Sequence, residues 1–355
     1  MSTSKGYREA TMARTGLIRD DLFLEHITED FHPEHPDRLR AIYSALDDPQ
    51  IQDQTAPLQP REATAEEIQW IHTESYYQTI ESTRDCGHLQ LDPDTHVSSQ
   101  SYRTAKLAAG GLCVLIDAVC SGEMKNGFAL VRPPGHHAEA GRGMGFCIYN
   151  NIAIATRYAQ HRGLAQKVLI VDWDLHHGNG TQHTFESDPT ILYFSSHQFP
   201  FYPGTGRPDE VGKGEGEGYT VNVPLPGGQG DGDFIRIYEE VLEPIANQFQ
   251  PDLVLVSAGF DTYCRDPLGG MGVTEDGFAE ITRILMRIAD SSCQGKIVLT
   301  LEGGYHLEGL ARSVKCVIQA LQGAGTPSSS WPQPSDTAER IVEQVLATQK
   351  AYWSL

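Results

Sequence analysis

Residues 167–180 have the sequence KVLIVDWDLHHGNG, a run of aliphatic side chains that ends in alternating polar ones. A run without polar alternation is typical of a strand buried on both faces of a parallel sheet. Alternate side chains of an extended chain share one side, so we expect Asp172, Asp174 and His176 to point the same way where the strand ends. The stretch therefore predicts a central strand with a polar cluster at its carboxyl end.

These residues alone leave two interpretations of the cluster open. The polar side chains could cap a following helix. They could also hold a divalent cation, which would offset the cost of burying two carboxylates and an imidazole. The rest of the chain is needed to choose between the two.

Composition narrows the class of protein. The 355 residues carry a formal net charge of -20, which argues against nucleic acid as a ligand, because such binding depends on Lys and Arg that neutralise phosphates. Seven scattered cysteines include no Cys-x-x-Cys pair and indicate a reducing compartment. Residues 1–20 lack the apolar core of a signal peptide, and no apolar run is long enough to span a membrane. We therefore expect a soluble, cytoplasmic protein.

Strand-like and helix-like segments alternate along the chain and predict a single α/β domain. Its central, mostly parallel sheet should be flanked by helices, with the active site at the carboxyl ends of the strands. No linker divides residues 1–323, and residues 324–355 should form a Pro/Ser-rich connection and a last helix that packs on the domain or on an oligomer partner. Besides the opening strand, we expect strands at 15–19, 128–131, 191–194, 219–223, 253–256 and 297–301, helices at 101–119, 150–161, 231–249 and 274–289, and a mobile glycine-rich loop at 203–218.

Four of the expected strands end in polar side chains that should meet at one edge of the sheet. These side chains are His136 and His137, then Asp172, Asp174 and His176, then Asp261, and last Tyr305. Among them, Asp174, His176 and Asp261 make a set of two carboxylates and one imidazole, which leaves positions for water and substrate as catalytic zinc sites require. The convergence favours a metal site over a helix cap.

The remaining histidines and the tyrosine suit other roles. His136 and His137 lack a third ligand and are better suited to acid/base work, because an imidazole exchanges its proton near neutral pH. Tyr305 follows two glycines, whose flexible backbone would let its hydroxyl turn toward a polarised oxygen. His32 and His35 each sit beside a proline in a turn, where the polarity typical of a loop is the simpler explanation.

At these motifs the chain resembles the zinc-dependent histone deacetylases, and specifically their class II branch. The resemblance covers about residues 15–321 and rests on RPPGHH (132–137), GFCIYNN (145–151), DWDLHHGNGTQ (172–182), SAGFD (257–261) and LEGGY (301–305). Glu302 and Asn179 favour class II, since class I enzymes tend to have Gly and Asp there. The resemblance implies zinc-dependent removal of acetyl or other acyl groups from lysine side chains, by attack of metal-activated water with a tandem-histidine acid/base pair.

The resemblance also implies roles for individual residues. The implied zinc ligands are Asp174, His176 and Asp261, the implied catalytic residues are His136, His137, Tyr305, Asp172 and Asn179, and the implied substrate contacts are Gly145, Phe146, Tyr202, Leu268 and Asp94. His136 would pair with Asp172, and His137 with Asn179. A structural potassium ion is implied near Asp172, Ser195 and Ser196, with the backbone of Asp174 and His176.

Three other functions are weighed against this one. An acetylpolyamine amidohydrolase would share the catalytic groups, but the position of its gatekeeping carboxylate is occupied here by Leu268. A two-manganese enzyme of the arginase type needs further carboxylates, and none follows Asp174 before Glu186. A silent acyl-lysine reader should have lost a catalytic group, and none is missing. The substrate stays open among acyl-lysine peptides, proteins and small acylated amines, as do acyl-chain length and a homo-oligomeric state.

Overall fold

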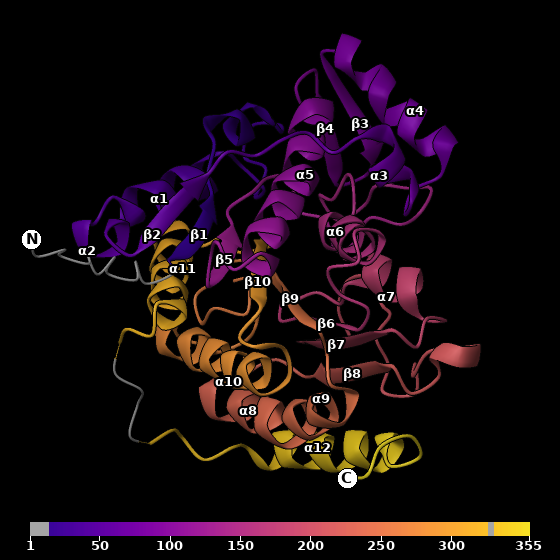
Figure 1. The fold of residues 1–355 in the computed structure, drawn as a ribbon, viewed down its shortest axis with the longest axis vertical. Coiled ribbons are helices and arrows are strands. Elements are labelled where there is room, and N and C mark those ends of the chain that lie inside the picture. The colour runs from indigo at the N-terminus through magenta and orange to yellow at the C-terminus, as the bar shows by residue number, and fades with distance from the viewer. Residues whose placement is uncertain (1–13, 326–329) are drawn as a thin grey trace, which may run out of the picture.

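Eight strands pair into one sheet in the computed structural model, which describes residues 14–325 and 330–355 (Figure 1). The strand order is β2-β1-β5-β10-β9-β6-β7-β8, and every pairing in this sheet is parallel. The eight strands are β1 Thr15–Ile18, β2 Thr55–Leu58, β5 Asn126–Ala129, β6 Val168–Asp172, β7 Ile191–Gln198, β8 Thr220–Leu225, β9 Leu253–Ala258 and β10 Ile297–Leu301. A separate antiparallel hairpin consists of β3 His88–Asp92 and β4 Thr95–Ser98. The predicted α/β fold with a mostly parallel sheet is confirmed.

Helices cover both faces of the sheet. They are α1 Asp37–Leu46, α2 Pro49–Gln52, α3 Ala65–Gln69, α4 Glu74–Ser82, α5 Ser101–Cys120, α6 Asn151–His161, α7 Asn179–Phe185, α8 Asp231–Ile237, α9 Glu243–Phe249, α10 Glu275–Cys293, α11 Leu307–Leu321 and α12 Asp336–Gln349. On one face α5 packs beside α6, and on the other α11 packs between α1 and α10, with α8 next to α10. In the described parts of the chain, no helix is both long and apolar enough to cross a bilayer.

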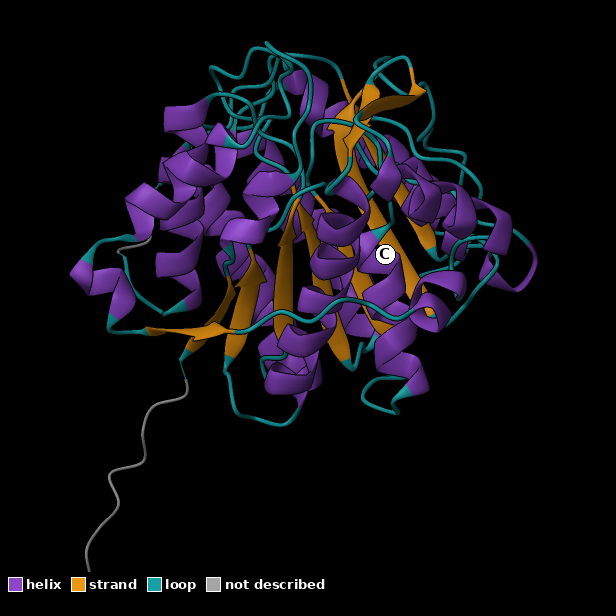
Figure 2. Cartoon of the chain, turned by 90° about the horizontal axis from the view of Figure 1, so that it is seen from above, coloured by secondary structure: helices purple, strands orange, loops and turns teal. Residues whose placement is uncertain are grey.

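Burial explains the position of each strand. All five residues of β6 are buried, in keeping with its place between β9 and β7. The two edge strands each contain a proline, Pro57 in β2 and Pro224 in β8. A proline cannot donate to a further strand, so these residues suit edges and would be costly in the centre. The long loops gather at the carboxyl edge of the sheet (Figure 2), where the polar clusters lie.

The structure differs from the sequence-based prediction in several elements. The strand expected at 128–131 spans Asn126–Ala129, and the buried Leu130 and Val131 already belong to the following loop. The helix expected at 231–249 is interrupted by a π-helical segment, Tyr238–Leu242, between α8 and α9. Residues 203–218 contain a 3-10 turn at Gly214–Gly216 and otherwise the irregular structure that was predicted.

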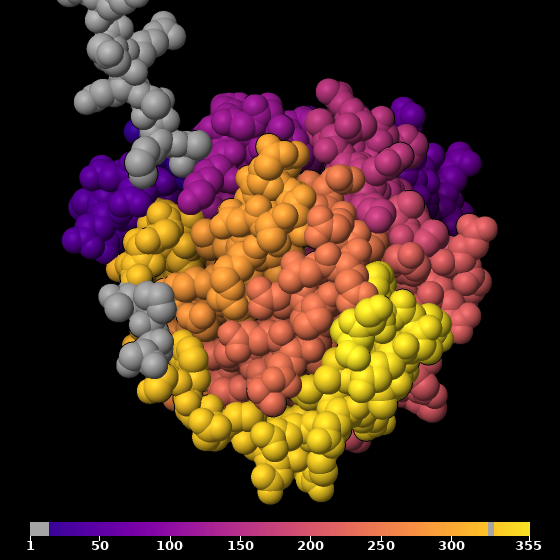
Figure 3. All heavy atoms as spheres, turned by 60° about the horizontal axis from the view of Figure 1, so that its bottom comes forward, coloured from indigo at the N-terminus to yellow at the C-terminus, as the bar shows by residue number. Residues whose placement is uncertain are grey.

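The last helix, α12, lies against the body of its own chain. It contacts β8 and α8, and the C-terminal segment runs along the surface of the domain (Figure 3). Gln349 Nε2 donates to the carbonyl of Thr220 in the edge strand at 3.2 Å, and Trp353 Nε1 donates to the carbonyl of Gly218 at 2.9 Å. The division of the chain at residue 323 stays a prediction. The expectations for residues 1–13 and 326–329 lie outside the described residues.

Candidate active site

The centre of the site is formed by Asp174, His176 and Asp261. Asp174 and His176 follow β6, and Asp261 follows the neighbouring β9. One potential ligand atom from each lies within 4.8 Å of the other two. His176 Nδ1 is 3.1 Å from Asp174 Oδ1 and 3.1 Å from Asp261 Oδ2. Backbone amides hold the two carboxylates, because Gly303 N donates to Asp174 Oδ2 at 2.8 Å and Leu175 N donates to Asp261 Oδ1 at 2.8 Å.

The charges of these groups fit a cation. Burial raises the pKa of Asp261 to about 7, and the negative charge of Asp174 adds to the effect. Burial alone would lower the pKa of His176, but hydrogen bonds to Asp174 and Asp261 raise it to about 10. The cluster therefore favours positive charge between its carboxylates. Two buried carboxylates and one imidazole that reaches the cavity form a donor set that could hold a divalent metal ion.

His136 stands beside this centre with a carboxylate behind it. Its Nδ1 donates to Asp172 Oδ2 at 3.0 Å, and its Nε2 lies 3.8 Å from Asp174 Oδ1. Burial alone would lower the pKa of His136, but Asp172 and Asp174 raise it to about 10. The predicted pairing of His136 with Asp172 is thus present in the structure, and it favours the cationic imidazole.

His137 has the opposite environment. Its Nδ1 lies 2.7 Å from Asn179 Oδ1, while Asn179 Nδ2 donates to the carbonyl of His137 at 3.3 Å and to Glu139 Oε1 at 2.5 Å. The amide oxygen can only accept, so Nδ1 carries the proton and Nε2 keeps its lone pair. Burial lowers the pKa of His137 well below its usual value, and the nearby His136 and His176 lower it further. His137 is therefore a neutral imidazole with one free acceptor.

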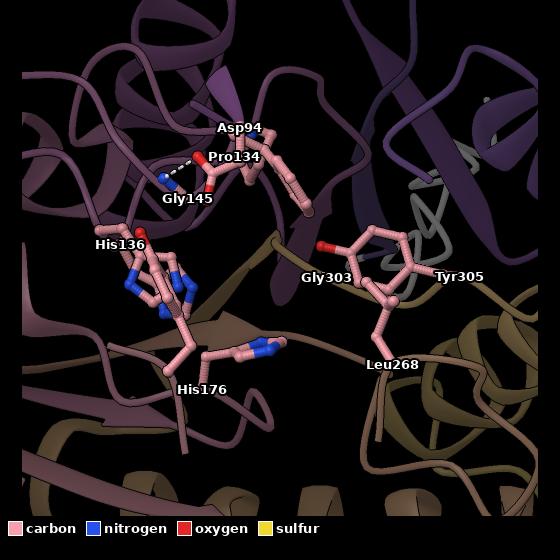
Figure 4. Close-up of a pocket in the computed structure, with 11 residues that line it drawn as sticks. Asp94, Pro134, His136, Gly145, His176, Leu268, Gly303 and Tyr305 are labelled. Carbon is pink, nitrogen blue, oxygen red and sulfur yellow. Dashed lines mark hydrogen bonds between the residues drawn. The ribbon is translucent and has the colours of Figure 1, made fainter. Parts of the chain in front are cut away.

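A cavity of about 90 Å³ opens above these groups. Asp94, Pro134, His136, His137, Gly145, Phe146, His176, Tyr202, Leu268, Gly303 and Tyr305 line it. Figure 4 shows the hydroxyl of Tyr305 pointing into the cavity from the side opposite His136 and His176. The structure thus brings the predicted substrate residues and three predicted catalytic residues to one cavity. Asp172, Asn179 and Asp261 do not line it, but each contacts a ring nitrogen of one lining histidine.

The walls of the cavity are aromatic. The ring of Tyr202 lies 5.2 Å from that of His137, and the ring of Phe146 lies 5.9 Å from that of Tyr305. Phe146 has a positive φ of 69°, a costly backbone conformation for a bulky residue that is found mostly at functional sites. Gly145 before it has no room for a side chain, since a Cβ there would lie 2.4 Å from His137 Cδ2.

Asp94 holds the rim of the cavity together. Its Oδ1 accepts from Gly145 N at 3.0 Å and from Thr95 Oγ1 at 2.9 Å. His32 lies behind it, with Nδ1 accepting from Glu34 N at 3.1 Å and Nε2 donating to the carbonyl of Asp94 at 3.1 Å. In the described residues, neither His32 nor His35 belongs to a group of three potential metal ligands.

The residues of the predicted potassium site also lie close together. Ser195 pairs with Asp172 across β6 and β7, and both Ser195 and Ser196 are fully buried. Ser195 Oγ is 2.9 Å from His197 Nδ1, and Ser196 Oγ is 3.1 Å from the hydroxyl of Tyr238. Potassium binding here stays a prediction.

Sequence reasoning missed a layer of charged residues beneath the cavity. Glu34 Oε2 accepts from Arg132 Nη2 at 2.6 Å, and Glu34 Oε1 accepts from Arg38 Nη1 at 3.1 Å; all three side chains are fully buried. Arg38 Nε donates to the carbonyl of Gly304 at 2.7 Å, next to Tyr305. The sequence offered one signal for this layer, which was Glu34 within His-Pro-Glu-His. The signal is weak, because a single glutamate in a loop indicates exposure unless its partners are known.

Comparison with known proteins agrees with this geometry. The model of the histone deacetylase domain matches residues 32–321. The chain belongs to the histone deacetylase family. It is 44% identical over 330 residues to histone deacetylase 15 of Arabidopsis thaliana, and 40% identical over 380 residues to histone deacetylase 7 of Homo sapiens. The resemblance to class II histone deacetylases that the sequence motifs indicated is confirmed.

The crystal structure of the HDA15 HD domain superposes with a TM-score of 0.90 at 43% identity, and the match covers 96% of this chain and 95% of that one. The alignments with the two whole relatives cover 91% and 96% of this chain, but only 59% and 40% of the relatives' length. This histone deacetylase chain therefore spans about half of the curated relatives that it matches.

Proposed function

We propose that this histone deacetylase is a zinc-dependent hydrolase that removes acetyl or other acyl groups from lysine side chains. The observation that carries the proposal is that ligand atoms of Asp174, His176 and Asp261 lie within 4.8 Å of one another. They lie beside a cavity that His136, His137 and Tyr305 help to line. Three protein ligands and an open side are the pattern of catalytic zinc. When bound, zinc would supply Lewis-acid activation of water and of the amide carbonyl.

The two histidines divide the proton transfers between them. His137 Nε2 has a free lone pair, because Asn179 fixes the proton on Nδ1, so His137 is the general base that takes a proton from the attacking water. The same nitrogen then returns the proton to the leaving lysine amine. His136, paired with Asp172, stays cationic and stabilises developing negative charge.

The other residues bind and orient the substrate. Tyr305 donates its hydroxyl to the oxygen that becomes negatively charged in the transition state. Phe146 and Tyr202 present apolar rings to the four-carbon stem of lysine, and Asp94 at the rim can accept from the backbone amides of a peptide. A potassium ion held near Asp172, Ser195 and Ser196 and a cytoplasmic location complete the proposal.

A metal-removal experiment tests the proposal. Hydrolysis of a fluorogenic acetyl-lysine peptide is measured before and after dialysis against a chelator and again after zinc is returned, together with the zinc content of the protein. We expect about one zinc per chain, loss of activity on chelation and recovery with zinc. Asp174→Ala should abolish activity, while Asp209→Ala, which removes a partner of the exposed Arg207, should not. Activity that survives both chelation and Asp174→Ala contradicts the proposal.

Comparison of two substrates tests the choice of lysine over polyamine. Leu268 lines the cavity, where a polyamine-selective site needs a carboxylate to pair with the distal ammonium. We therefore expect a higher kcat/KM for the acetyl-lysine peptide than for acetylated spermidine. A large preference for the polyamine would replace lysine as the proposed substrate and leave the proposed chemistry intact.

A further inference from the structure

Glu302 is a buried carboxylate next to the site that the proposed chemistry does not use. It follows β10, its side chain is fully buried, and its Oε2 accepts from Gly135 N at 2.6 Å and from His136 N at 3.2 Å. Its Oε1 accepts from Ser257 Oγ, at the end of β9, at 3.0 Å. One side chain thus joins the ends of two neighbouring strands to the loop that carries both catalytic histidines.

The two amides that Glu302 accepts from have no other acceptor in residues 14–325 and 330–355. The carbonyl groups of the same loop are held from elsewhere, by Asn151 Nδ2 on Pro133 at 3.1 Å and by Thr181 N on His136 at 3.1 Å. Gly135 packs closely against the backbone of Asn151, since a Cβ at Gly135 would lie 2.5 Å from Asn151 N. Removal of the Glu302 acceptor would therefore leave the amide side of the loop without an anchor.

The backbone of Glu302 is itself fixed. Its N–H donates to the carbonyl of Ala258 at 3.0 Å, and its carbonyl accepts from Arg38 Nη2 at 2.5 Å. In the described part of the chain its carboxylate makes no ion pair shorter than 4.0 Å, although a ring nitrogen of His136 lies within 4.8 Å of it. A buried carboxylate without a directly paired cation is costly. A shorter acceptor could satisfy only one of the two amides, whereas a side chain of this length reaches two consecutive amides from a fixed base.

We propose that Glu302 is a positioning residue, which sets the place of His136 and His137 over the substrate through its hydrogen bonds to the two loop amides. The inference rests on the proposed function and deepens it. Hydrogen-bonding reach, and not negative charge, is the property that matters. A small displacement of His137 would cost turnover more than substrate binding, because the base must lie within hydrogen-bond distance of the attacking water.

Two conservative variants separate reach from charge. Glu302→Asp keeps the charge but is one methylene shorter and cannot reach both amides, so we expect kcat to fall about 100-fold with KM within about threefold. Glu302→Gln loses the charge but can turn its amide oxygen to the two N–H groups and its NH2 to Ser257 Oγ, so we expect kcat within about fivefold of the wild type. Steady-state kinetics on the acetyl-lysine peptide, zinc content and melting temperature are measured for each.

Glu67 provides a matched control. It is also buried, accepts from a backbone amide, Thr64 N at 2.8 Å, and lies outside the cavity. Glu67→Asp should lower the melting temperature and leave kcat and KM unchanged. The inference is overturned if Glu302→Asp keeps full turnover, if Glu302→Gln loses as much as Glu302→Asp, or if zinc content falls in step with kcat. A wild-type chain that does not hydrolyse acyl-lysine overturns the proposed function and, with it, this inference.

Discussion

Tyr305 contributes a single hydroxyl to the cavity, which makes it the sharpest test of the proposed chemistry at the scale of one residue. Tyr305→Phe keeps the ring beside Phe146 and under the guanidinium of Arg38. We expect kcat to fall about 100-fold, or about 3 kcal/mol, since one donor to the oxyanion is lost, with zinc content and melting temperature unchanged. Kinetics and thermal unfolding check this, and turnover within about threefold of the wild type would remove Tyr305 from the proposed mechanism.

Residues differ in how far the sequence alone could place them. Asp174 and Asp261 were predictable as neighbours because each ends an apolar run, and parallel strands end at one edge. Glu302 was noticed only as a class marker, and Glu34 was not singled out at all. A buried carboxylate becomes plausible only when its partners are known. Arg38 is four positions from Glu34, but the second partner, Arg132, is 98 positions away.

The segment that precedes α1 is tied to the strand ends by charge, and this contact can be tested at the scale of elements. Glu34 carries the only carboxylate that pairs with Arg38 and Arg132 among the described residues. Glu34→Gln keeps the shape but leaves both guanidinium groups without a counter-charge, so we expect a loss of about 3–5 kcal/mol in the free energy of unfolding. Glu62→Gln, at a half-exposed partner of Arg103, should cost less than about 1 kcal/mol. The free energy of unfolding of each variant is measured by urea unfolding. Equal losses in the two variants would show that the buried ion pairs of Glu34 stabilise the protein no more than an exposed pair does.

Among elements, strong local signals were predictable and weak ones were not. The capping box of Thr64 and Glu67 is present at the start of α3, as the sequence indicates. The β3–β4 hairpin was not predicted. His88–Asp92 does alternate polar and apolar residues, but the strand is exposed or half-buried throughout and belongs to no buried core face. The π-helical interruption at Tyr238–Leu242 is also invisible in sequence, since the apolar spacing of a helix continues through it.

The C-terminal segment closes one edge of the sheet, which predicts a stability contribution. The ring of Trp353 packs against Tyr219 and Phe249, in addition to its hydrogen bond to Gly218. Trp353→Ala should lower the free energy of unfolding by about 2 kcal/mol, because the side chain is only partly buried. Tyr352→Phe removes one exposed hydrogen bond and should cost less than about 1 kcal/mol. A Trp353→Ala chain as stable as the wild type would mean that this contact is not made in solution.

At the scale of the whole molecule, buried neutral histidines set the response of stability to acid. His72 is almost fully buried, with Nδ1 donating to the carbonyl of Glu139 at 2.9 Å and Nε2 accepting from Asn150 N at 2.9 Å. Burial lowers its pKa from 6.5 to about 4. Through these two hydrogen bonds, His72 links the segment after α3 to the loop that carries His136 and His137. The bond from Asn150 N requires an uncharged ring, because only a neutral imidazole has a nitrogen that can accept.

The sign of the pH effect follows from this shift. Between pH 6.5 and 4 the unfolded chain binds a proton at His72 that the folded chain does not, so stability is full above pH 6.5 and is lost as the pH falls toward 4, by up to about 3 kcal/mol. His72→Gln cannot titrate, so its free energy of unfolding should fall less steeply in this window, by about 1.4 kcal/mol per pH unit. The exposed His88→Gln serves as the control and should keep the wild-type slope. Urea unfolding at several pH values measures how the free energy of unfolding changes with pH. Only a depressed pKa of His72 in the folded state can make the slopes of His72→Gln and the wild type differ. Identical slopes would therefore show that His72 titrates normally in the folded protein.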